Sequence, residues 1–121
     1  MPTVHSFVSG DFLIFQLESG YALLRVLAVD ETDAGEVWHL AAYKDLFLDV
    51  EAVDEALDDA TSLIIEKPHV ALTNRAFEST QVARMRNVPL REDDLEDLKA
   101  WKLSAEKTVS DRSIRLLLGL R

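Results

Sequence analysis

Residues 10–43 read GDFLIFQLESGYALLRVLAVDETDAGEVWHLAAY, and this stretch decides the fold. It contains three segments dense in β-favouring residues, separated by short polar turns that end in glycine: Asp11–Leu17, Tyr21–Val29 and Glu36–Tyr43. Strands joined by such short connections are typical of an antiparallel meander. The first third of the chain therefore predicts the centre of an antiparallel sheet.

Both faces of these strands are apolar, because alternate positions on each side of the second strand carry Leu, Val or Ala. A sheet with one wet face would show a cleaner alternation of polar and apolar residues. Barrel curvature, the downstream helices or a partner must cover the second face. Arg25 stands in the middle of one apolar face. It either extends its guanidinium into water or pairs with a carboxylate of the acidic helix that follows.

The rest of the chain alternates short strands with short helices. An amphipathic helix is expected at Asp49–Asp59, and Lys67-Pro68 is expected to break a short strand at Ser62–Glu66. Two further strands, His69–Thr73 and Thr80–Met85, are expected to be joined through residues 74–78. Helices should follow at Arg91–Leu103 and at Ser110–Leu118, the latter capped by Ser110.

Together these segments predict one α+β domain over residues 1–121. Its β-rich part spans residues 10–87 and includes the acidic helix, and its helical part spans residues 91–118. We expect a curved antiparallel sheet of about five strands that closes towards a partly formed, SH3-like barrel.

Composition excludes several classes of protein. The chain has 13 basic and 22 acidic residues, a net charge of −9, so it is a poor candidate for binding a nucleic-acid backbone. The absence of cysteine excludes disulfides, thiol nucleophiles and cysteine-based metal sites. No apolar run approaches 18 residues, and residues 1–6 show no signal-peptide pattern. We therefore expect a cytoplasmic protein that does not enter membranes.

The negative charge is concentrated in one segment. From Asp30 to Asp59 there are eleven acidic residues and one basic residue, Lys44, for a net charge of −10. This segment either keeps the chain in solution or forms a docking face for a basic partner, whose association the charge would steer. The residues expected to bind such a partner lie on the acidic helix: Glu51, Asp54, Glu55, Asp58 and Asp59.

No signature of catalysis is present, so an enzyme is not the expected class and no cofactor or metal is predicted. The alternative function is a small-molecule binding module or enzyme with a pocket between sheet and helices, lined by Tyr21, Arg25, Trp38 and His39. If it does not bind a ligand, His39 is expected to be a strand histidine with a structural role and its hydrogen bonds satisfied. A further alternative is that His39 and His69 come together to bind a metal ion. Asp11 is expected to fix the start of its strand by accepting a backbone hydrogen bond.

The last helix raises the question of self-association. Residues 114–120 carry five Leu or Ile side chains, and so short a helix is marginal in water on its own. The apolar side either packs on the chain's own sheet or forms a twofold homodimer through Ile114, Leu117 and Leu118.

Two segments resemble a known family. FVSGDFLIFQLESGYALLRVLAVD, with Gly10, Asp11, Gly20, Tyr21, Arg25 and Val26, and RMRNVPLREDDLEDLKAWK are similar to the immunity-protein family numbered twenty-six of bacterial polymorphic toxin systems. The resemblance implies a β-rich, partly barrelled domain that binds and neutralises a toxin. The acidic helix around Asp54 and the Leu-rich tail depart from the family pattern.

Overall fold

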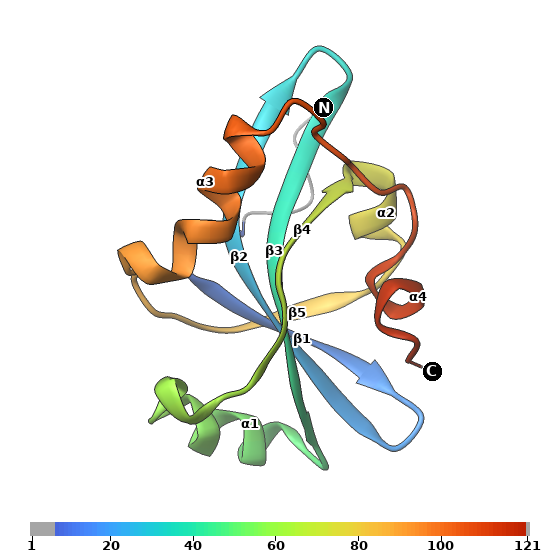
Figure 1. Cartoon of the computed structure of the whole chain (residues 1–121). Coiled ribbons are helices and arrows are strands. Elements are labelled where there is room, and N and C mark those ends of the chain that lie inside the picture. Colours follow the sequence, from blue (N-terminus) through green and yellow to red (C-terminus); the bar gives the residue numbers. More distant parts are fainter. Residues whose placement is uncertain (1–6, 121) are drawn as a thin grey trace.

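The computed structural model describes residues 7–120, and Figure 1 shows their arrangement. Residues 1–6, in which no targeting signal is expected, lie outside the described part of the chain. Five strands form one antiparallel sheet in the order β4-β3-β2-β1-β5: β1 (Asp11–Leu17), β2 (Gly20–Thr32), β3 (Gly35–Phe47), β4 (Ile65–Thr73) and β5 (Val82–Asn87). Short helices follow the strands: α1 (Val50–Leu57), η1 (Ala60–Ser62), α2 (Asn74–Glu78), η2 (Glu92–Leu95), α3 (Glu96–Leu103) and α4 (Ile114–Leu118).

Close packing of the backbone explains two glycines. A side-chain carbon at Gly20, in the turn between β1 and β2, would lie 2.1 Å from the carbonyl oxygen of Phe47 at the end of β3. Gly10 has a φ of +93°, and a side-chain carbon there would lie 2.7 Å from the carbonyl oxygen of Val88. Only glycine fits both positions without moving a neighbouring strand.

One face of the sheet carries a single continuous core. Its largest side chains include Trp38 and Phe77, whose rings stack with centroids 3.9 Å apart. Helices α2 and α4 cover this face, with Ala76 and Ile114 buried in it. Figure 1 shows these two helices together on one side of the sheet, with α3 on the other. We call this side the α2–α4 face.

The other face carries two smaller cores beneath two separate helices. Val53 and Leu57 of α1 pack there with Phe12 and its neighbours, and Leu98 of α3 packs with Leu27 and Ala41. We call this side the α1–α3 face. The downstream helices thus cover both apolar faces. This is one of the three alternatives that the sequence left open.

The α+β class and the five-stranded antiparallel sheet are confirmed. The sheet is open, because β4 and β5 lie at its opposite edges, so the expected closure towards an SH3-like barrel is not confirmed. The two long strands extend past their expected ends, to Thr32 and Phe47.

Two local predictions are wrong, and one short helix was not predicted. Strand β4 continues through Pro68 instead of breaking there, because β4 is an edge strand and its register against β3 shifts between Val70 and Lys67. Edges and irregular pairings are where a sheet tolerates proline. The connection through residues 74–78, to which no secondary structure was assigned, is the helix α2, whose first turn is capped by the hydroxyl of Thr73. The last helix starts later than expected and is capped by Ser113, while Ser110 bridges to β4.

The C-terminal helix packs on the chain's own sheet. Ile114 is buried, and Leu117 and Leu118 are partly buried against the same core. Gly119, with φ of +67°, ends the helix in the left-handed conformation that glycine adopts freely. Leu116 remains 70% exposed on the outer side.

Candidate functional site

The acidic helix α1 presents its carboxylates to solvent. Asp49 caps it, accepting a hydrogen bond from the backbone N–H of Ala52 at 2.8 Å. Because Val53 and Leu57 point into the sheet, the remaining positions face outwards. All the acidic residues predicted to bind a partner are exposed: Glu51, Asp54, Glu55, Asp58 and Asp59.

Arg86 on β5 neutralises part of this charge. Its guanidinium pairs with Asp54 at 2.5 Å and with Asp58 at 3.1 Å, and the hydrogen bond that it donates to Asp54 raises the pKa of Arg86. Among residues 7–120, Glu51 and Glu55 form no ion pair. The helix thus holds two carboxylates that anchor it to β5 and two that are available to a partner.

An apolar surface adjoins the start of α1. Leu46 at the end of β3, Leu48 in the link to α1 and Val50 at the start of α1 are 57%, 85% and 41% exposed. Ile64 and Ile65 are also exposed and lie against the same part of β3, because the N–H of Lys44 donates to the carbonyl of Ile64. These side chains lie towards the same end of the sheet but on both of its faces, because Leu46 pairs with Ala22 of the α2–α4 face and Ile65 pairs with Tyr43 of the α1–α3 face. We call the five together the apolar end surface. Most isolated exposed apolar residues need no explanation, but several together beside charged groups are typical of interaction sites.

Arg25 is buried, and both terminal nitrogens of its guanidinium donate hydrogen bonds within the fold. Its side chain is 6% exposed and donates to the carbonyl of Val88 at 2.6 Å, to that of Pro89 at 3.2 Å and to the carboxylate of Asp94 at 3.2 Å. Its guanidinium also lies 4.7 Å from the centre of the Phe12 ring. Arg25 is therefore paired, as one alternative proposed, but with η2 instead of the acidic helix. It fills the gap between the two cores of the α1–α3 face.

A hydrogen-bonded chain of three side chains lies beside α3. Nε2 of His39 is 2.9 Å from a carboxylate oxygen of Asp30, and Nδ1 of His39 is 2.9 Å from Nε2 of His69. His39 is completely buried, whereas Asp30 is 37% exposed and His69 is partly buried. The ring of Trp101 packs against both imidazoles, at centroid distances of 4.7 Å and 5.7 Å.

Burial keeps both imidazoles neutral near pH 7. Desolvation lowers the pKa of His39, against the opposing effect of Asp30, and it lowers the pKa of His69 to about 4 with help from His39. A neutral imidazole has one N–H donor and one acceptor nitrogen. The Asp30 carboxylate accepts from Nε2–H of His39, so Nδ1 of His39 accepts from Nε2–H of His69. Nδ1 of His69 then carries a lone pair.

The structure does not gather the predicted pocket residues. Tyr21, Arg25 and His39 lie on the α1–α3 face, in different places, and Trp38 lies in the core of the α2–α4 face, where its indole N–H donates to Asn74 at 2.9 Å. His39 and His69 do converge, but as a direct hydrogen bond that occupies Nδ1 of His39. Among residues 7–120, no group of three or more potential ligands could hold a metal ion.

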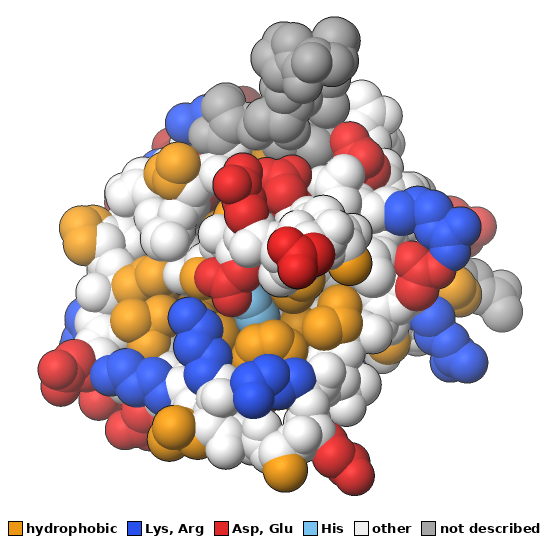
Figure 2. Space-filling model, turned by 90° about the horizontal axis from the view of Figure 1, so that it is seen from above, with side chains coloured by type: hydrophobic (Ala, Val, Ile, Leu, Met, Phe, Trp, Pro, Cys, Tyr) orange, Lys and Arg blue, Asp and Glu red, His pale blue; other side chains and the backbone are white. Residues whose placement is uncertain are grey.

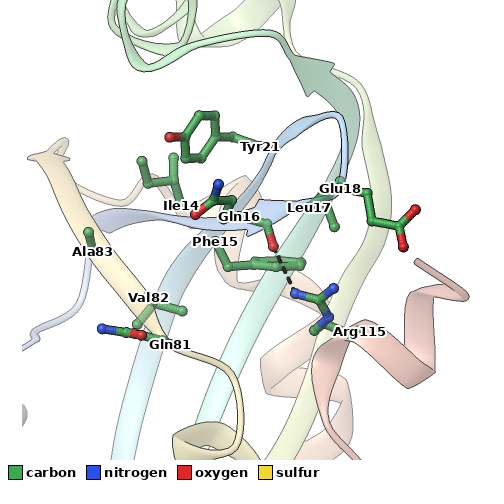
Figure 3. A pocket seen from close by; sticks show the side chains of 10 residues that line it. All are labelled: Ile14, Phe15, Gln16, Leu17, Glu18, Tyr21, Gln81, Val82, Ala83 and Arg115. Carbon is green, nitrogen blue, oxygen red and sulfur yellow. Dashed lines mark hydrogen bonds between the residues drawn. The ribbon is translucent and has the colours of Figure 1, made fainter. Parts of the chain in front are cut away.

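Tyr21 borders a separate hollow near the turn between β1 and β2. Figure 3 shows it, with Ile14 and Gln16 on one side and Val82 on the other. Its volume is about 610 Å³. Arg115 of α4 donates to the backbone carbonyl of Gln16 at 2.7 Å, which β5 is too short to pair. Arg115 therefore serves the fold here by satisfying an unpaired strand carbonyl.

Asp11 has the structural role that the sequence indicated. It is completely buried and accepts hydrogen bonds from the backbone N–H of Val8 at 2.9 Å and from the side chain of Asn87 at 2.8 Å. These bonds fix the start of β1 against β5.

Asp30 is the functional candidate that the sequence reasoning missed. It lies diagonal to His39 across the β2–β3 pair, because Asp30 faces Val37 and Ala28 faces His39. His69 is likewise two residues from Ala71, the partner of His39 on β4. Only the strand register could have revealed this group of side chains. The register follows once the turn at residues 33–34 and the continuation of β4 through Pro68 are known.

Comparisons of the chain with protein-family models, with curated proteins and with solved structures found no match. Within residues 7–120, none of the helices has the length and apolar character needed to cross a membrane. The residues of the site therefore carry the functional argument.

Proposed function

We propose that this protein is a non-enzymatic, cytoplasmic interaction domain that binds a basic partner through α1, in the manner of a bacterial immunity or antitoxin protein. The observation that carries the proposal is the combination, at one end of the molecule, of two carboxylates that form no ion pair within residues 7–120, those of Glu51 and Glu55, with the apolar end surface. Charge steers the encounter of two proteins, and apolar area at the centre of an interface stabilises the complex.

The carboxylates of the acidic helix differ in their contacts, and this difference supports a division of roles. Asp54 and Asp58 hold Arg86, so reversing their charge would disturb the packing of α1 on β5. Glu51 and Glu55 can be reversed without breaking an ion pair within residues 7–120. They are therefore the positions at which to test partner binding.

The test is comparative affinity capture from the cells in which the chain occurs. The bait proteins are the wild type, the double variant Glu51→Lys with Glu55→Lys, and a control of equal charge, Glu31→Lys with Glu106→Lys. The control changes exposed residues on the β2–β3 hairpin and after α3, away from α1 and from the apolar end surface. A basic protein should be retained by the wild type and the control and lost by the α1 variant. Equal recovery by all three would contradict the proposal.

Salt dependence adds a kinetic criterion once the partner is known. The association rate should fall steeply as salt rises for the wild type and less steeply for the α1 variant, because exposed charges are screened. A rate that is the same for both at low salt would exclude steering by these two residues.

A homodimer through Ile114, Leu117 and Leu118 remains a separate prediction. Leu116 offers exposed apolar area on α4, but the three named residues pack on the sheet of their own chain. Light scattering at increasing protein concentration decides between monomer and dimer. If a dimer forms, removal of residues 114–121 should yield monomer, and a dimer that survives the truncation has another interface.

Small-molecule binding is the second candidate function. A different observation favours it, namely the Asp30–His39–His69 chain and the pocket into which it leads.

A further inference from the structure

A pocket of about 430 Å³ lies along the outer edge of β4, where the chain returns from α3 towards α4. Its wall is mostly apolar, with Pro68, Val70, Trp101 and Leu117. The Trp101 ring is held in place because its N–H donates to the carbonyl of Thr108 at 2.9 Å. The two charged residues of its lining, Glu66 and Lys67, have opposite signs.

His69 is the polar group of this pocket, and its orientation is fixed from behind. Its Nε2 is occupied by His39, which Asp30 holds in turn. Figure 2 shows a histidine recessed among hydrophobic side chains, with acidic side chains on one side and basic ones on the other. Within residues 7–120, Nδ1 of His69 has no hydrogen-bond partner.

The surroundings of His69 differ from those of a histidine that only fills space in a core, because its ring is oriented by hydrogen bonds and it lines a pocket. A carboxylate that orients one imidazole nitrogen is the usual means by which proteins fix the tautomer of a functional histidine. Here the effect passes through His39, and its outcome is an acceptor nitrogen at the wall of an apolar pocket. An apolar pocket with one oriented polar group is typical of a small-molecule site.

We propose that the pocket binds a small, uncharged aromatic molecule that donates one hydroxyl or ring N–H hydrogen bond to Nδ1 of His69. The aromatic character follows from Trp101, whose ring offers a surface for edge or offset packing. We expect an uncharged ligand because the charges of Glu66 and Lys67 are opposite. The Asp30–His39–His69 chain, in addition, presents a neutral acceptor nitrogen and no charged group. The low pKa values of both histidines support this neutral state at pH 7.

Phenol and its methyl ether, anisole, are the matched probes, because they differ in the hydroxyl that would donate to His69. Titration of the full chain, followed by the backbone amide NMR signals of Val70, Ala71 and Ser110, should show saturable binding of phenol with a Kd of about 1–10 mM, ordinary for so small a ligand. Anisole should bind about fivefold more weakly, the usual effect of one neutral hydrogen bond. Equal affinities, or no binding of phenol, would overturn the proposal.

Variants test the assignment to His69. His69→Leu should abolish the preference for phenol, and His69→Gln, which offers an amide donor to His39 and a carbonyl to the pocket, should keep part of it. Leu103→Ala, at an exposed position outside the pocket lining, is the matched control and should bind as the wild type does. Unchanged phenol binding by His69→Leu would contradict the assignment.

The role of Asp30 as a positioning residue has its own readout. The ¹⁵N chemical shifts of the imidazole nitrogens report which one carries the proton, and in the wild type Nδ1 of His69 should be unprotonated. Asp30→Ala should let both tautomers form and reduce the preference for phenol over anisole. A protonated Nδ1 in the wild type would refute the proposal even if the His69 variants fail to fold.

The pocket and the acidic helix are independent sites. The variant Glu51→Lys with Glu55→Lys should bind phenol like the wild type. Failure of one proposal therefore leaves the other intact.

Discussion

The two faces of the sheet are built differently. Thirteen buried residues form one uninterrupted cluster on the α2–α4 face, whereas the buried clusters of the α1–α3 face contain six and three residues. The buried Arg25 and His39 belong to the α1–α3 face, beside the gap between α1 and α3. The α2–α4 face therefore supplies most of the apolar stabilisation, while the divided α1–α3 face has room for polar groups with specific partners.

The largest expected effect comes from removing apolar volume on the α2–α4 face. Leu40→Ala, at a completely buried position, should lower the free energy of unfolding by about 4 kcal/mol, because the cavity lies in a continuous core. Leu98→Ala on the α1–α3 face should lower the free energy of unfolding by only about 2 kcal/mol, because α3 can move towards the sheet and reduce the cavity. Urea denaturation measures both values. Equal losses would mean that the faces contribute alike.

Arg25 tests whether the divided face depends on its polar groups. Arg25→Met should lower the free energy of unfolding by about 2–4 kcal/mol, because it leaves Asp94 and two carbonyls without their buried donor. Arg91→Met, at a side chain that is 70% exposed, is the control and should change stability by less than about 0.5 kcal/mol. A similar small effect at both positions would show that Arg25 only fills space.

The histidine pair predicts a dependence of stability on pH. Both pKa values are lowered on folding, so the unfolded chain takes up protons first as the pH falls below 6.5. The stabilising contribution of the two neutral histidines should be fully present above pH 6.5. It should decrease as the pH falls towards 4, where His69 itself is protonated in the folded chain. Asp30 favours protonation of His39 and Lys102 opposes it, while Asp97 favours protonation of His69.

The contribution of His69 to this loss should be roughly 1–2 kcal/mol, after allowing for its partial exposure. Denaturation at several pH values measures it, with His69→Gln as the variant that removes the titrating group. The slope between pH 6.5 and 4 should be smaller in His69→Gln. An unchanged slope would assign the pH dependence to the carboxylates.

The smallest effect is expected at the surface of α1. Arg86→Gln removes the ion pairs with Asp54 and Asp58, and the melting temperature should fall slightly at low salt and almost not at all at high salt. A large loss that persists at high salt would mean that Arg86 acts through packing of its stem on β5.

The sequence predicted the strands and both apolar faces because alternation and glycine-ended turns are local signals. It could not predict the partner of Arg25, because Asp94 lies 69 residues away and only packing of η2 brings the two together. The short helix α2 was missed because five residues give no periodic pattern. Pro68 was read as a break because the sequence does not reveal that β4 lies at an edge.

The candidate site was predictable only in part. The acidic helix is local and its exposed face follows from helix geometry, so its five carboxylates were found from the sequence. The Asp30–His39–His69 chain depends on the register of three strands, including an irregular pairing next to Pro68. A shift of one residue would send each side chain to the opposite face.

The edges of the open sheet carry a consequence for how the chain behaves in a crowded solution. An unpaired strand edge is a template on which other chains can add and grow into fibrous aggregates. Strand β4 opposes such growth with Pro68, which lacks an N–H, and with Glu66 and Lys67, while β5 carries Arg84 and Arg86. Ser110 bonds to Ala71 and Thr73 and so occupies the end of the β4 edge. Proline, charge and a short bridging segment thus let the sheet keep two edges and still resist polymerisation.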